Sequence, residues 1–473
     1  MKSRELNEIL DLLDQSVAIV KGKIEIKDEK KLRSNIYRLA EVSALETGVK
    51  QGLARYLTRK IALSLGIIPS SINDLYIARG MGKVNSNFTV PAMNLRALSF
   101  EAAKAVFRAA LKLDVGAFIF EIARSEIGYT DQRPSEYTTS ILAAAIAEGY
   151  KGPVFIQGDH FQVSAKKYTA NPESELNALR ELIKESIAAG FFNIDVDTST
   201  MVDLSKSSVV EQQYNNTSLS AMFTAYIRSL EPKNVRISVG GEIGEVGGHN
   251  STEEELRAYM DGFNTELKKL DTKAFGLSKI SVQTGTSHGG VVLPDGSIAK
   301  VNVDFDTLLK LSRIARADYK MGGAVQHGAS TLPEDAFGKF VEAEACEVHL
   351  ATNFQNMLFD RLPVELRDEI YRFLDEKNAA DRKPDMTDEQ FYYKVRKNAI
   401  GPFKKQLWKM PTEKLNEIEK AWEDQFAKLF KYLAVVNTRQ MVSQTITPVI
   451  VEPQLSDYVS GVSPEADISD LAD

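Results

Sequence analysis

Apolar residues recur along the first 84 residues at the spacing of an amphipathic helix. One face of the first predicted helix carries Leu6, Ile9, Leu10, Leu13 and Val17. The same spacing returns twice further along, and the segment that begins at Pro69 interrupts it. We therefore expect a helical N-terminal extension over residues 1–84, with a role in packing or oligomerisation.

From about residue 85 the pattern changes to short apolar runs separated by helical segments. Eight runs read as strands, at 88–94, 115–121, 154–159, 192–197, 235–242, 280–284, 319–326 and 346–350. Helical periodicity lies between most of them, for example at 99–113, 137–147, 173–189 and 251–270. Alternating strands and helices predict a parallel sheet, and eight such units in about 275 residues match an α/β fold of the (β/α)8 TIM barrel type. We assign residues 85–360 to this barrel as the catalytic domain.

The chain after residue 360 divides into two parts. Residues 361–452 are mostly helical in pattern and form a predicted C-terminal extension. Residues 452 to 473 hold six acidic residues, no lysine or arginine and few large apolar residues. Such a composition is typical of disordered segments, so we expect residues 453–473 to form an acidic, disordered tail.

Composition narrows the classes of function. Lysine and arginine number 58 against 65 acidic residues, a net charge of −7, and no basic run is present. This balance argues against nucleic acid or an anionic membrane surface as a partner. The single cysteine, Cys346, excludes an internal disulfide and fits a reducing compartment. Without an apolar N-terminal segment or a membrane-length apolar run, we expect a cytoplasmic protein.

Histidine is scarce and unevenly placed. The five histidines all fall within one stretch of 190 residues, at His160, His249, His288, His327 and His349. Catalytic groups of a barrel enzyme sit where the strands end, and here the strand endings are rich in polar residues. We conclude that the central part of the chain uses imidazole chemistry.

Three of these histidines follow predicted strands three, six and seven. They are His160, His288 and His327. Three neutral imidazoles with one open position describe a catalytic zinc site. Glu242, at the end of strand five, is either an outer carboxylate that supports a ligand or an alternative ligand. For His249 and His349 a structural role and a functional role both stay open.

Glycines follow two of the metal-ligand candidates. Gly289 follows His288, and Gly328 with Ser330 follows His327. Backbone N–H groups and a hydroxyl beside the metal are how late barrel strands cradle a phosphate group. Residues 291–300 have the pattern of a hairpin inserted after strand six.

These motifs together resemble the class II, metal-dependent ketose-bisphosphate aldolases, the fructose- and tagatose-bisphosphate enzymes. The matching segments, in the order the family has them, are Pro91-Ala-Met-Asn94, Asp159-His160, the segment of Asp197, Gly241-Glu242, Gly285-Thr-Ser-His288-Gly289 and His327-Gly-Ala-Ser330. The resemblance covers about residues 88–360 and leaves both terminal extensions outside.

The resemblance implies a role for each matching residue. His160, His288 and His327 would hold one catalytic Zn²⁺, with room for a second divalent or a monovalent cation. Asp159 would be the acid/base that acts on the C4 hydroxyl. The phosphate cradle would be formed by Gly289, Gly328, Ser330 and Thr352, and Asn94 and Asp197 would support the site. The implied partners are a phosphorylated ketose and dihydroxyacetone phosphate, bound by a homo-oligomer.

The sequence also departs from the family. Where a mobile-loop glutamate exchanges a proton with the substrate carbon, this chain has His249-Asn250, and Glu245, Glu253 or His249 are its candidate substitutes. On strand eight, His349 and Ala351 replace an asparagine and an aspartate of the family. A serine at the end of strand two is Ala123 here.

We therefore carry three hypotheses forward. The first is a zinc-dependent aldolase that cleaves a ketose phosphate, by default fructose 1,6-bisphosphate. The second is a zinc-dependent sugar-phosphate epimerase, suggested by the changed loop and strand-eight residues. The third is a non-catalytic, stabilising barrel subunit, suggested by Phe120-Glu-Ile-Ala-Arg-Ser, which is similar to the partner subunit of the tagatose-bisphosphate enzymes.

Overall fold

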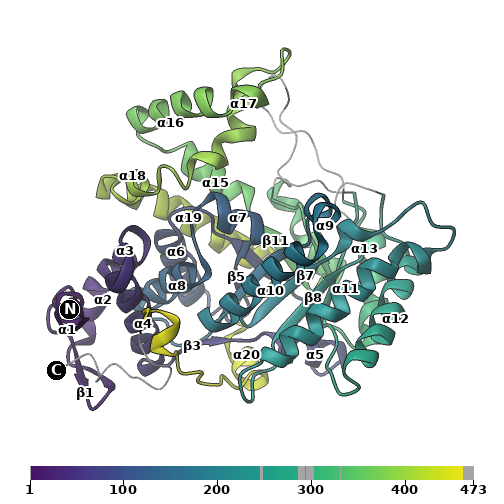
Figure 1. Ribbon diagram of the computed structural model, residues 1–473, viewed down its shortest axis with the longest axis horizontal. Coiled ribbons are helices and arrows are strands. Elements are labelled where there is room, and N and C mark those ends of the chain that lie inside the picture. The colour runs from purple at the N-terminus through teal and green to yellow at the C-terminus, as the bar shows by residue number, and fades with distance from the viewer. Residues whose placement is uncertain (1, 245–248, 286–292, 294–302, 331, 462–473) are drawn as a thin grey trace.

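Eight parallel strands close into a barrel at the centre of the computed structural model, which describes residues 2–244, 249–285, 293, 303–330 and 332–461 (Figure 1). Their chain order is also their order around the barrel, and the last strand pairs with the first, Leu350 opposite Met93. The strands are β4 (Val90–Asn94), β5 (Ile119–Ala123), β6 (Gly152–Gln162), β7 (Asn193–Asp197), β8 (Ser238–Glu242), β9 (Lys279–Val282), β10 (Ala324–Gln326) and β11 (Glu347–Leu350). The predicted (β/α)8 barrel is confirmed, and each predicted strand run contains or overlaps an observed strand.

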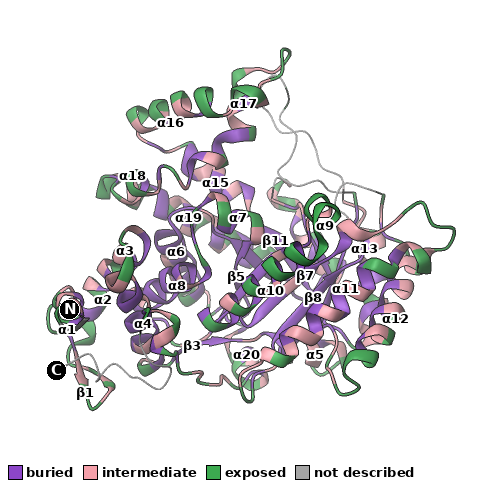
Figure 2. Ribbon diagram, in the orientation of Figure 1, coloured by how far each residue is buried: buried purple, intermediate pink, exposed green. Residues whose placement is uncertain are grey.

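Helices cover the outside of the barrel, with buried residues where they face the strands, as Figure 2 shows. The outer helices are α6 (Ser99–Lys112), α8 (Pro134–Glu148), α10 (Pro172–Ala189), α11 (Val209–Leu230), α12 (Glu253–Leu270) and α13 (Phe305–Tyr319), with the short α7 (Arg124–Tyr129), α9 (Ala165–Ala170), α14 (Gly338–Glu342) and α15 (Thr352–Phe359) at the connections. Local signals set their ends. Asn171 caps α10 by accepting a hydrogen bond from the Ser174 N–H, and Gly190, at φ +100°, ends it. Among the described residues, no helix is long and apolar enough to cross a membrane.

The N-terminal extension is only partly helical. It contains α1 (Lys2–Asp11), α2 (Glu29–Asn35), α3 (Tyr37–Leu45) and α4 (Gly48–Ser64), but β1 (Val17–Val20) and β2 (Lys23–Ile26) form an antiparallel hairpin between α1 and α2. The helix predicted to reach Val17 ends at Asp11, because Asp14 and Gln15 take positive φ angles. Lys21 and Gly22, both at positive φ, then make the hairpin turn. The expectation of an all-helical extension is therefore wrong at residues 17–26.

A ninth strand lies outside the barrel. β3 (Ile67–Ser70) pairs in parallel with the first residues of β6 and is followed by α5 (Asn73–Gly80). Asn193 of β7 holds the end of β3: its side chain accepts from the Ile72 N–H and donates to the Ser70 carbonyl. Pro69 fits because β3 is an edge strand, where a missing N–H costs little. The sequence analysis interpreted Pro69 only as an interruption of the helical pattern and did not predict this strand.

The C-terminal extension is mostly helical and lies along the barrel wall. It contains α16 (Val364–Lys377), α17 (Asp388–Val395), α18 (Lys404–Trp408), α19 (Thr412–Tyr432) and α20 (Arg439–Thr445). α19 packs on α6, where Arg108 bridges Glu419 and Glu423. In Figure 1, α16 and α17 project on the side of the barrel where α7 and α15 lie. The extension thus reaches the end of the barrel that carries the functional groups.

The first part of the predicted disordered tail, up to residue 461, is packed against the rest of the protein. Leu455 and Val459 are each 1% exposed, and Tyr458 packs against the ring of Tyr56. The Tyr458 hydroxyl also accepts a hydrogen bond from Arg59 of α4. Disorder is therefore wrong for this part of the tail, because three hydrophobic residues at close spacing outweigh the acidic composition around them. Residues 462–473 lie outside the described part of the chain.

Candidate metal centre and substrate cavity

A cavity of about 320 Å³ lies at the carboxyl ends of the barrel strands. Its walls come from the ends of β4, β5, β6, β10 and β11 and from the start of α15. Seven residues that the sequence singled out line it, namely Asn94, Asp159, His160, His327, Gly328, Ser330 and Thr352. Glu242 and Asp197 do not line the cavity, and both approach His160 at its Nδ1 atom. The cavity therefore gathers most of the predicted site residues that the structure describes.

A bulge in β6 places two consecutive side chains at the mouth. The pairing register between β6 and β7 shifts between Gly158 and Phe161, and His160 takes a positive φ of 40°. In a regular strand Asp159 and His160 would point to opposite faces, but here both line the cavity. Positive φ is unusual for histidine, so the backbone at His160 is strained. This conformation allows the His160 side chain to face the cavity.

Three side chains converge as metal donors. The ligand atoms of His160, Glu242 and His327 lie within 4.8 Å of one another. The rings of His160 and His327 have centroids 4.3 Å apart, and Glu242 Oε2 lies 3.4 Å from His160 Nδ1. Two imidazoles and a carboxylate are a donor set that suits zinc, so the residues present fit this ion. His288, the third predicted histidine, lies outside the described residues, as does Gly289 of the cradle.

Asp197 holds the first of these histidines. Its Oδ2 lies 2.9 Å from His160 Nδ1, while its Oδ1 accepts hydrogen bonds from the hydroxyl and the N–H of Ser199. Gln162 donates to the same carboxylate at 2.6 Å. A carboxylate that fixes one ring nitrogen leaves the other for a metal, which is the usual arrangement around metal-bound imidazoles.

The local charges are strongly coupled. Burial opposes the imidazolium form of His160, yet Asp159, Glu242 and Asp197 together raise its pKa well above the ordinary value. Burial also raises the pKa of Glu242 well above its usual range, and the nearby Asp197 adds to the shift. A cluster that retains protons in this way would release them when a cation takes their place, so metal binding here depends on pH.

The cradle expected for phosphate is partly built by β10 and α15. Ser330 accepts a hydrogen bond at 2.7 Å from the N–H of Ala351, the residue that precedes α15. Thr352 begins that helix, and Gly328 adopts φ +71° beside His327. A helix start next to the loops after strands seven and eight is the common phosphate position of barrel enzymes. Asn94 lies nearby and donates to Glu126 at 2.6 Å.

A buried polar network fills the barrel beneath the cavity, and the sequence analysis missed it. Lys279, 1% exposed, donates to Gln157 at 2.8 Å, to Asp195 at 2.9 Å and to Glu347 at 2.5 Å. Burial disfavours the ammonium form, but Asp195 and Glu347 raise the pKa of Lys279 above its usual value. Tyr76 donates to the second oxygen of Glu347. The sequence signal that could have revealed this network is a charged residue in an apolar strand, such as Lys279 or Glu347.

His349 connects this network to the cavity. Its Nδ1 lies 2.9 Å from Glu121 Oε2 and 3.3 Å from Asp159 Oδ1. Its Nε2 lies 2.8 Å from Glu347 Oε1, and its ring centroid is 4.0 Å from that of His327. The structure therefore places His349 in the site, whereas the sequence left both a structural and a functional role open. Glu121, fully buried in the middle of β5, is a further member that the sequence did not identify.

Burial and charge act on the carboxylates near His349 in opposite directions. Burial raises the pKa of Glu121 to about 7, although His349 opposes the shift. Burial also disfavours ionised Asp159, but His160 and His349 lower its pKa well below the ordinary value. Asp159 is therefore held ionised, the state in which a carboxylate can accept a proton.

Two of the three candidates for the missing loop glutamate, His249 and Glu253, do not line the cavity. His249 is exposed and its Nε2 lies 2.7 Å from Glu255, at the start of α12. Glu253 pairs with Arg257 and Lys310 on the outer surface of the barrel. Glu245 and most of the predicted hairpin at 291–300 lie outside the described residues.

Two cations that the sequence did not identify also line the cavity. Arg96 follows β4 and pairs with Glu126 at 2.7 Å. Lys397 comes from the C-terminal extension, and its ammonium lies 5.8 Å from the centre of the Tyr129 ring. No carboxylate among the described residues pairs with Lys397. The extension therefore contributes a positive charge to the mouth of the barrel.

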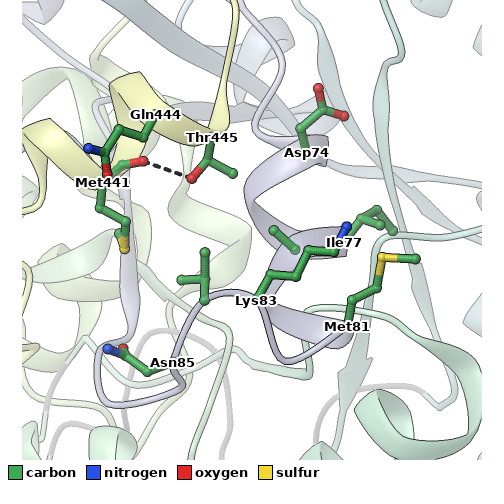
Figure 3. A pocket seen from close by; sticks show the side chains of 10 residues that line it. Asp74, Ile77, Met81, Lys83, Asn85, Met441, Gln444 and Thr445 are labelled. Carbon is green, nitrogen blue, oxygen red and sulfur yellow. Dashed lines mark hydrogen bonds between the residues drawn. The ribbon is translucent and has the colours of Figure 1, made fainter.

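Two larger hollows lie away from the strand ends. One, of about 650 Å³, separates α5 from α20 and is lined by Asp74, Lys83 and several methionine and aliphatic side chains (Figure 3). The other, of about 820 Å³, lies on the outer surface of α11 and α12. No histidine lines either hollow. The larger volume of these hollows therefore does not identify the candidate metal centre.

Comparison with known proteins agrees with this geometry. A family model described as Fructose-bisphosphate aldolase class-II matches residues 83–431. No curated protein matches the sequence.

Three solved structures illustrate the likeness in fold. Fructose-bisphosphate aldolase from Campylobacter jejuni is 18% identical, with a TM-score of 0.47 over 79% of this chain and 96% of that one. The YdjI aldolase from Escherichia coli K12 is 13% identical, with a TM-score of 0.46 over 78% and 98%. The fructuronate-tagaturonate epimerase UxaE from Cohnella laeviribosi is 11% identical, with a TM-score of 0.52 over 89% and 90%. At such identities the likeness concerns the fold alone.

Proposed function

The chain belongs to the class-II fructose-bisphosphate aldolase family, and we propose that it is a zinc-dependent aldolase acting on a ketose phosphate. The default substrate is fructose 1,6-bisphosphate, cleaved reversibly to dihydroxyacetone phosphate and an aldehyde. One observation carries the proposal: the ligand atoms of His160, Glu242 and His327 converge, and the two histidines line a cavity together with Asp159 and Ser330.

The metal would be held by His160 and His327, with Glu242 beside them. His288, which the family resemblance implies as a ligand, is placed there by the same proposal. When bound, zinc supplies a Lewis acid that polarises the ketose carbonyl. Asp197 keeps His160 in the orientation that this binding requires.

Asp159 is the proposed acid/base. In the cleavage direction its carboxylate accepts the proton of the C4 hydroxyl, and the O–H electron pair forms the aldehyde carbonyl. The C3–C4 bond breaks, its electron pair stays with the dihydroxyacetone phosphate fragment, and C3 then takes up a proton from water, while Asp159 releases its proton to solvent before the next turnover. His349, 3.3 Å away, fixes the position of the Asp159 carboxylate.

The phosphate group would occupy the opposite wall of the cavity. Ser330 offers its hydroxyl, Thr352 offers the start of α15, and Gly328 leaves space for close approach of backbone N–H groups. A phosphate group held there would direct the carbonyl end of the sugar toward the metal donors. Binding energy from a part of the substrate far from the reacting bond can increase the rate in this way, because it orients the reacting atoms.

A sugar-phosphate epimerase is the second candidate. It is favoured by the changes around the reacting carbon: His349 stands beside Asp159, and the loop glutamate of the family is replaced by His249-Asn250. The non-catalytic subunit is disfavoured, because a barrel freed from catalysis has no need for metal donors, Asp159 and a phosphate cradle in one cavity.

Product analysis tests the proposal. Purified protein is incubated with ketose mono- and bisphosphates, with and without a chelator, and its products are identified. We expect triose phosphate release that the chelator abolishes and zinc restores. Asp159→Asn should lower kcat by about 10²-fold or more. A new hexose phosphate without trioses would select the epimerase, and full turnover by Asp159→Asn would contradict the assigned proton transfer.

We further propose that the enzyme works in the cytoplasm as a homo-oligomer. The oligomeric state is measured by light scattering during size-exclusion chromatography. A mass near 52.5 kDa, that of one chain, would contradict this part of the proposal.

A further inference from the structure

We infer that Lys279 is a positioning residue of the reaction, which acts on the wall of the substrate cavity through Gln157 and Glu121. Lys279 lies beneath the cavity and does not line it, whereas Glu121 does. The inference rests on the proposed function, because the same wall carries Asp159, the proposed acid/base.

The interior of this barrel is unusual for its fold. Barrel interiors are normally filled by layers of branched aliphatic side chains. Here the interior contains Lys279 of β9, Gln157 of β6 and Glu347 of β11, each at most 1% exposed. A buried ion pair is seldom more stabilising than well-packed hydrophobic residues of similar volume. The network therefore points to a role beyond stability.

Lys279 fixes the orientation of the Gln157 amide. Its ammonium donates to Gln157 Oε1 at 2.8 Å. An ammonium can only donate, so the amide oxygen must face Lys279 and the amide nitrogen is left for carboxylate acceptors. That nitrogen donates to Glu121 Oε2 at 3.0 Å and to Glu347 Oε1 at 2.8 Å. Without Lys279 nothing would hold the amide oxygen in place, and the contact with Glu121 would weaken.

Glu121 connects this amide to the cavity wall. Glu121 Oε2 lies 2.9 Å from His349 Nδ1, and the same nitrogen lies 3.3 Å from Asp159 Oδ1. Gln157 also stands opposite Glu121 in the pairing of β5 with β6. The path from the ammonium to the wall therefore consists of three contacts, of 2.8, 3.0 and 2.9 Å. A displacement of Gln157 would change the position of the carboxylate that is proposed to accept the C4 proton.

Lys279 does not itself react. Besides Gln157, its ammonium donates to Asp195 at 2.9 Å and to Glu347 at 2.5 Å, so its three protons all have acceptors. Tyr76 of α5 donates to the other oxygen of Glu347 and helps to fix that carboxylate. An ammonium that is fully bonded and outside the cavity is neither a nucleophile nor a proton donor for the substrate. The competing explanation is a purely structural ion pair, whose loss would lower Tm without a specific effect on kcat.

Steady-state kinetics separate the two explanations. Lys279→Met removes the charge and keeps the length of the side chain. We expect kcat to fall about 10- to 100-fold and KM to change less than about threefold, because a displaced catalytic group slows the reaction more than it weakens binding. The matched control is Arg55→Met: Arg55 is another largely buried cation, 12% exposed and paired with Glu136, but it lies outside the cavity. This control should lower Tm and leave kcat and KM unchanged, with folding checked by circular dichroism.

A second variant tests the path and guards against misfolding of the first. Gln157→Leu leaves Lys279 with both carboxylates and removes the link to Glu121, so it should show a similar fall in kcat. Because the two residues act in series, the double variant should lose less than about threefold beyond either single variant.

Three results would overturn the inference and leave the proposed function intact: wild-type kcat in Lys279→Met, wild-type kcat in Gln157→Leu, or losses that multiply in the double variant. If Lys279→Met does not fold, the result with Gln157→Leu decides. The reaction followed is triose release or epimerisation, whichever the wild type performs. A wild-type protein that performs neither would contradict the proposed function itself, and the inference with it.

Discussion

Asp197 Oδ2 lies 2.9 Å from His160 Nδ1, and this contact determines which nitrogen of His160 remains for a metal. Asp197 is 1% exposed and is itself held by Ser199 and Gln162. The orientation of His160 therefore depends on a carboxylate that does not line the substrate cavity.

Asp197→Ala should weaken zinc binding about 10- to 100-fold, because the His160 ring would lose the partner that fixes its orientation. Zinc affinity is measured by competition with a chromophoric chelator. Asp203→Ala is the matched control, since Asp203 is a partly exposed aspartate nearby that also accepts from a serine, Ser205. Equal affinity in the two variants would show that Asp197 does not support the metal.

Lys397→Ala should raise KM for a phosphorylated ketose about tenfold and change kcat by less than about threefold. Lys397 lines the cavity without a described carboxylate partner, so its charge is free to attract an anionic substrate. A loss of about 1.4 kcal/mol corresponds to the tenfold change. Lys394→Ala is the control, because Lys394 pairs with Asp381 and does not line the cavity. A fall in kcat with unchanged KM would contradict this role.

Glu101 predicts a pH-dependent contribution to stability. Burial raises the pKa of Glu101 from 4.5 to about 8, and Oε2 has no hydrogen-bond partner among the described residues. The folded protein therefore holds a proton that the unfolded chain releases above pH 4.5. The free energy of unfolding must then fall as pH rises from 4.5 to 8, by at most about 1.4 kcal/mol per pH unit.

Glu101→Gln removes this titration, so the variant should exceed the wild type in Tm at pH 8 by more than it does at pH 5. Thermal unfolding followed by circular dichroism provides the comparison. Glu173→Gln, on the exposed surface of α10, is the control and should not change the pH profile. If the two variants behaved alike, Glu101 would not be a buried neutral acid in the folded state.

The sequence predicted the barrel because strand ends and helix periods are local signals. Asp159 and His327 were located by their position after apolar runs, and both line the cavity. The side-by-side placement of Asp159 and His160 could not be predicted, since it depends on a bulge in β6 that pairing with β7 determines. Lys397 could not be identified from the sequence for a similar reason, because the C-terminal extension reaches the cavity only through tertiary packing.

The sequence contains signs of the buried polar network, but it does not show which of the charged residues pair with each other. Lys279 and Glu347 are charged residues within apolar strands, which a parallel strand buried on both faces rarely contains. Their pairing needs the barrel to bring β9 and β11 to either side of β10. Likewise, the hairpin at residues 17–26 follows from positive φ angles after α1, which a hydrophobic period does not reveal.

The tail is expected to be held by one glycine of α4. Gly52 packs against the backbone carbonyl of Tyr458, and a Cβ atom added there would overlap that carbonyl. In an exposed helix Gly→Ala stabilises by about 1 kcal/mol, but here the clash involves backbone and cannot be relieved by a side-chain rotation. Gly52→Ala should therefore destabilise the protein or displace the segment that carries Leu455 and Val459.

Limited proteolysis and thermal unfolding measure the two effects. We expect Gly52→Ala to be cleaved after residue 445 much faster than the wild type, with a Tm lower by several degrees. Gly338→Ala, at a helical position with open space around it, should leave both unchanged. Because the buried faces of Leu455 and Val459 depend on this close approach, a tail that remained protected in Gly52→Ala would mean that its side chains, not the backbone contact at Gly52, hold it on α4.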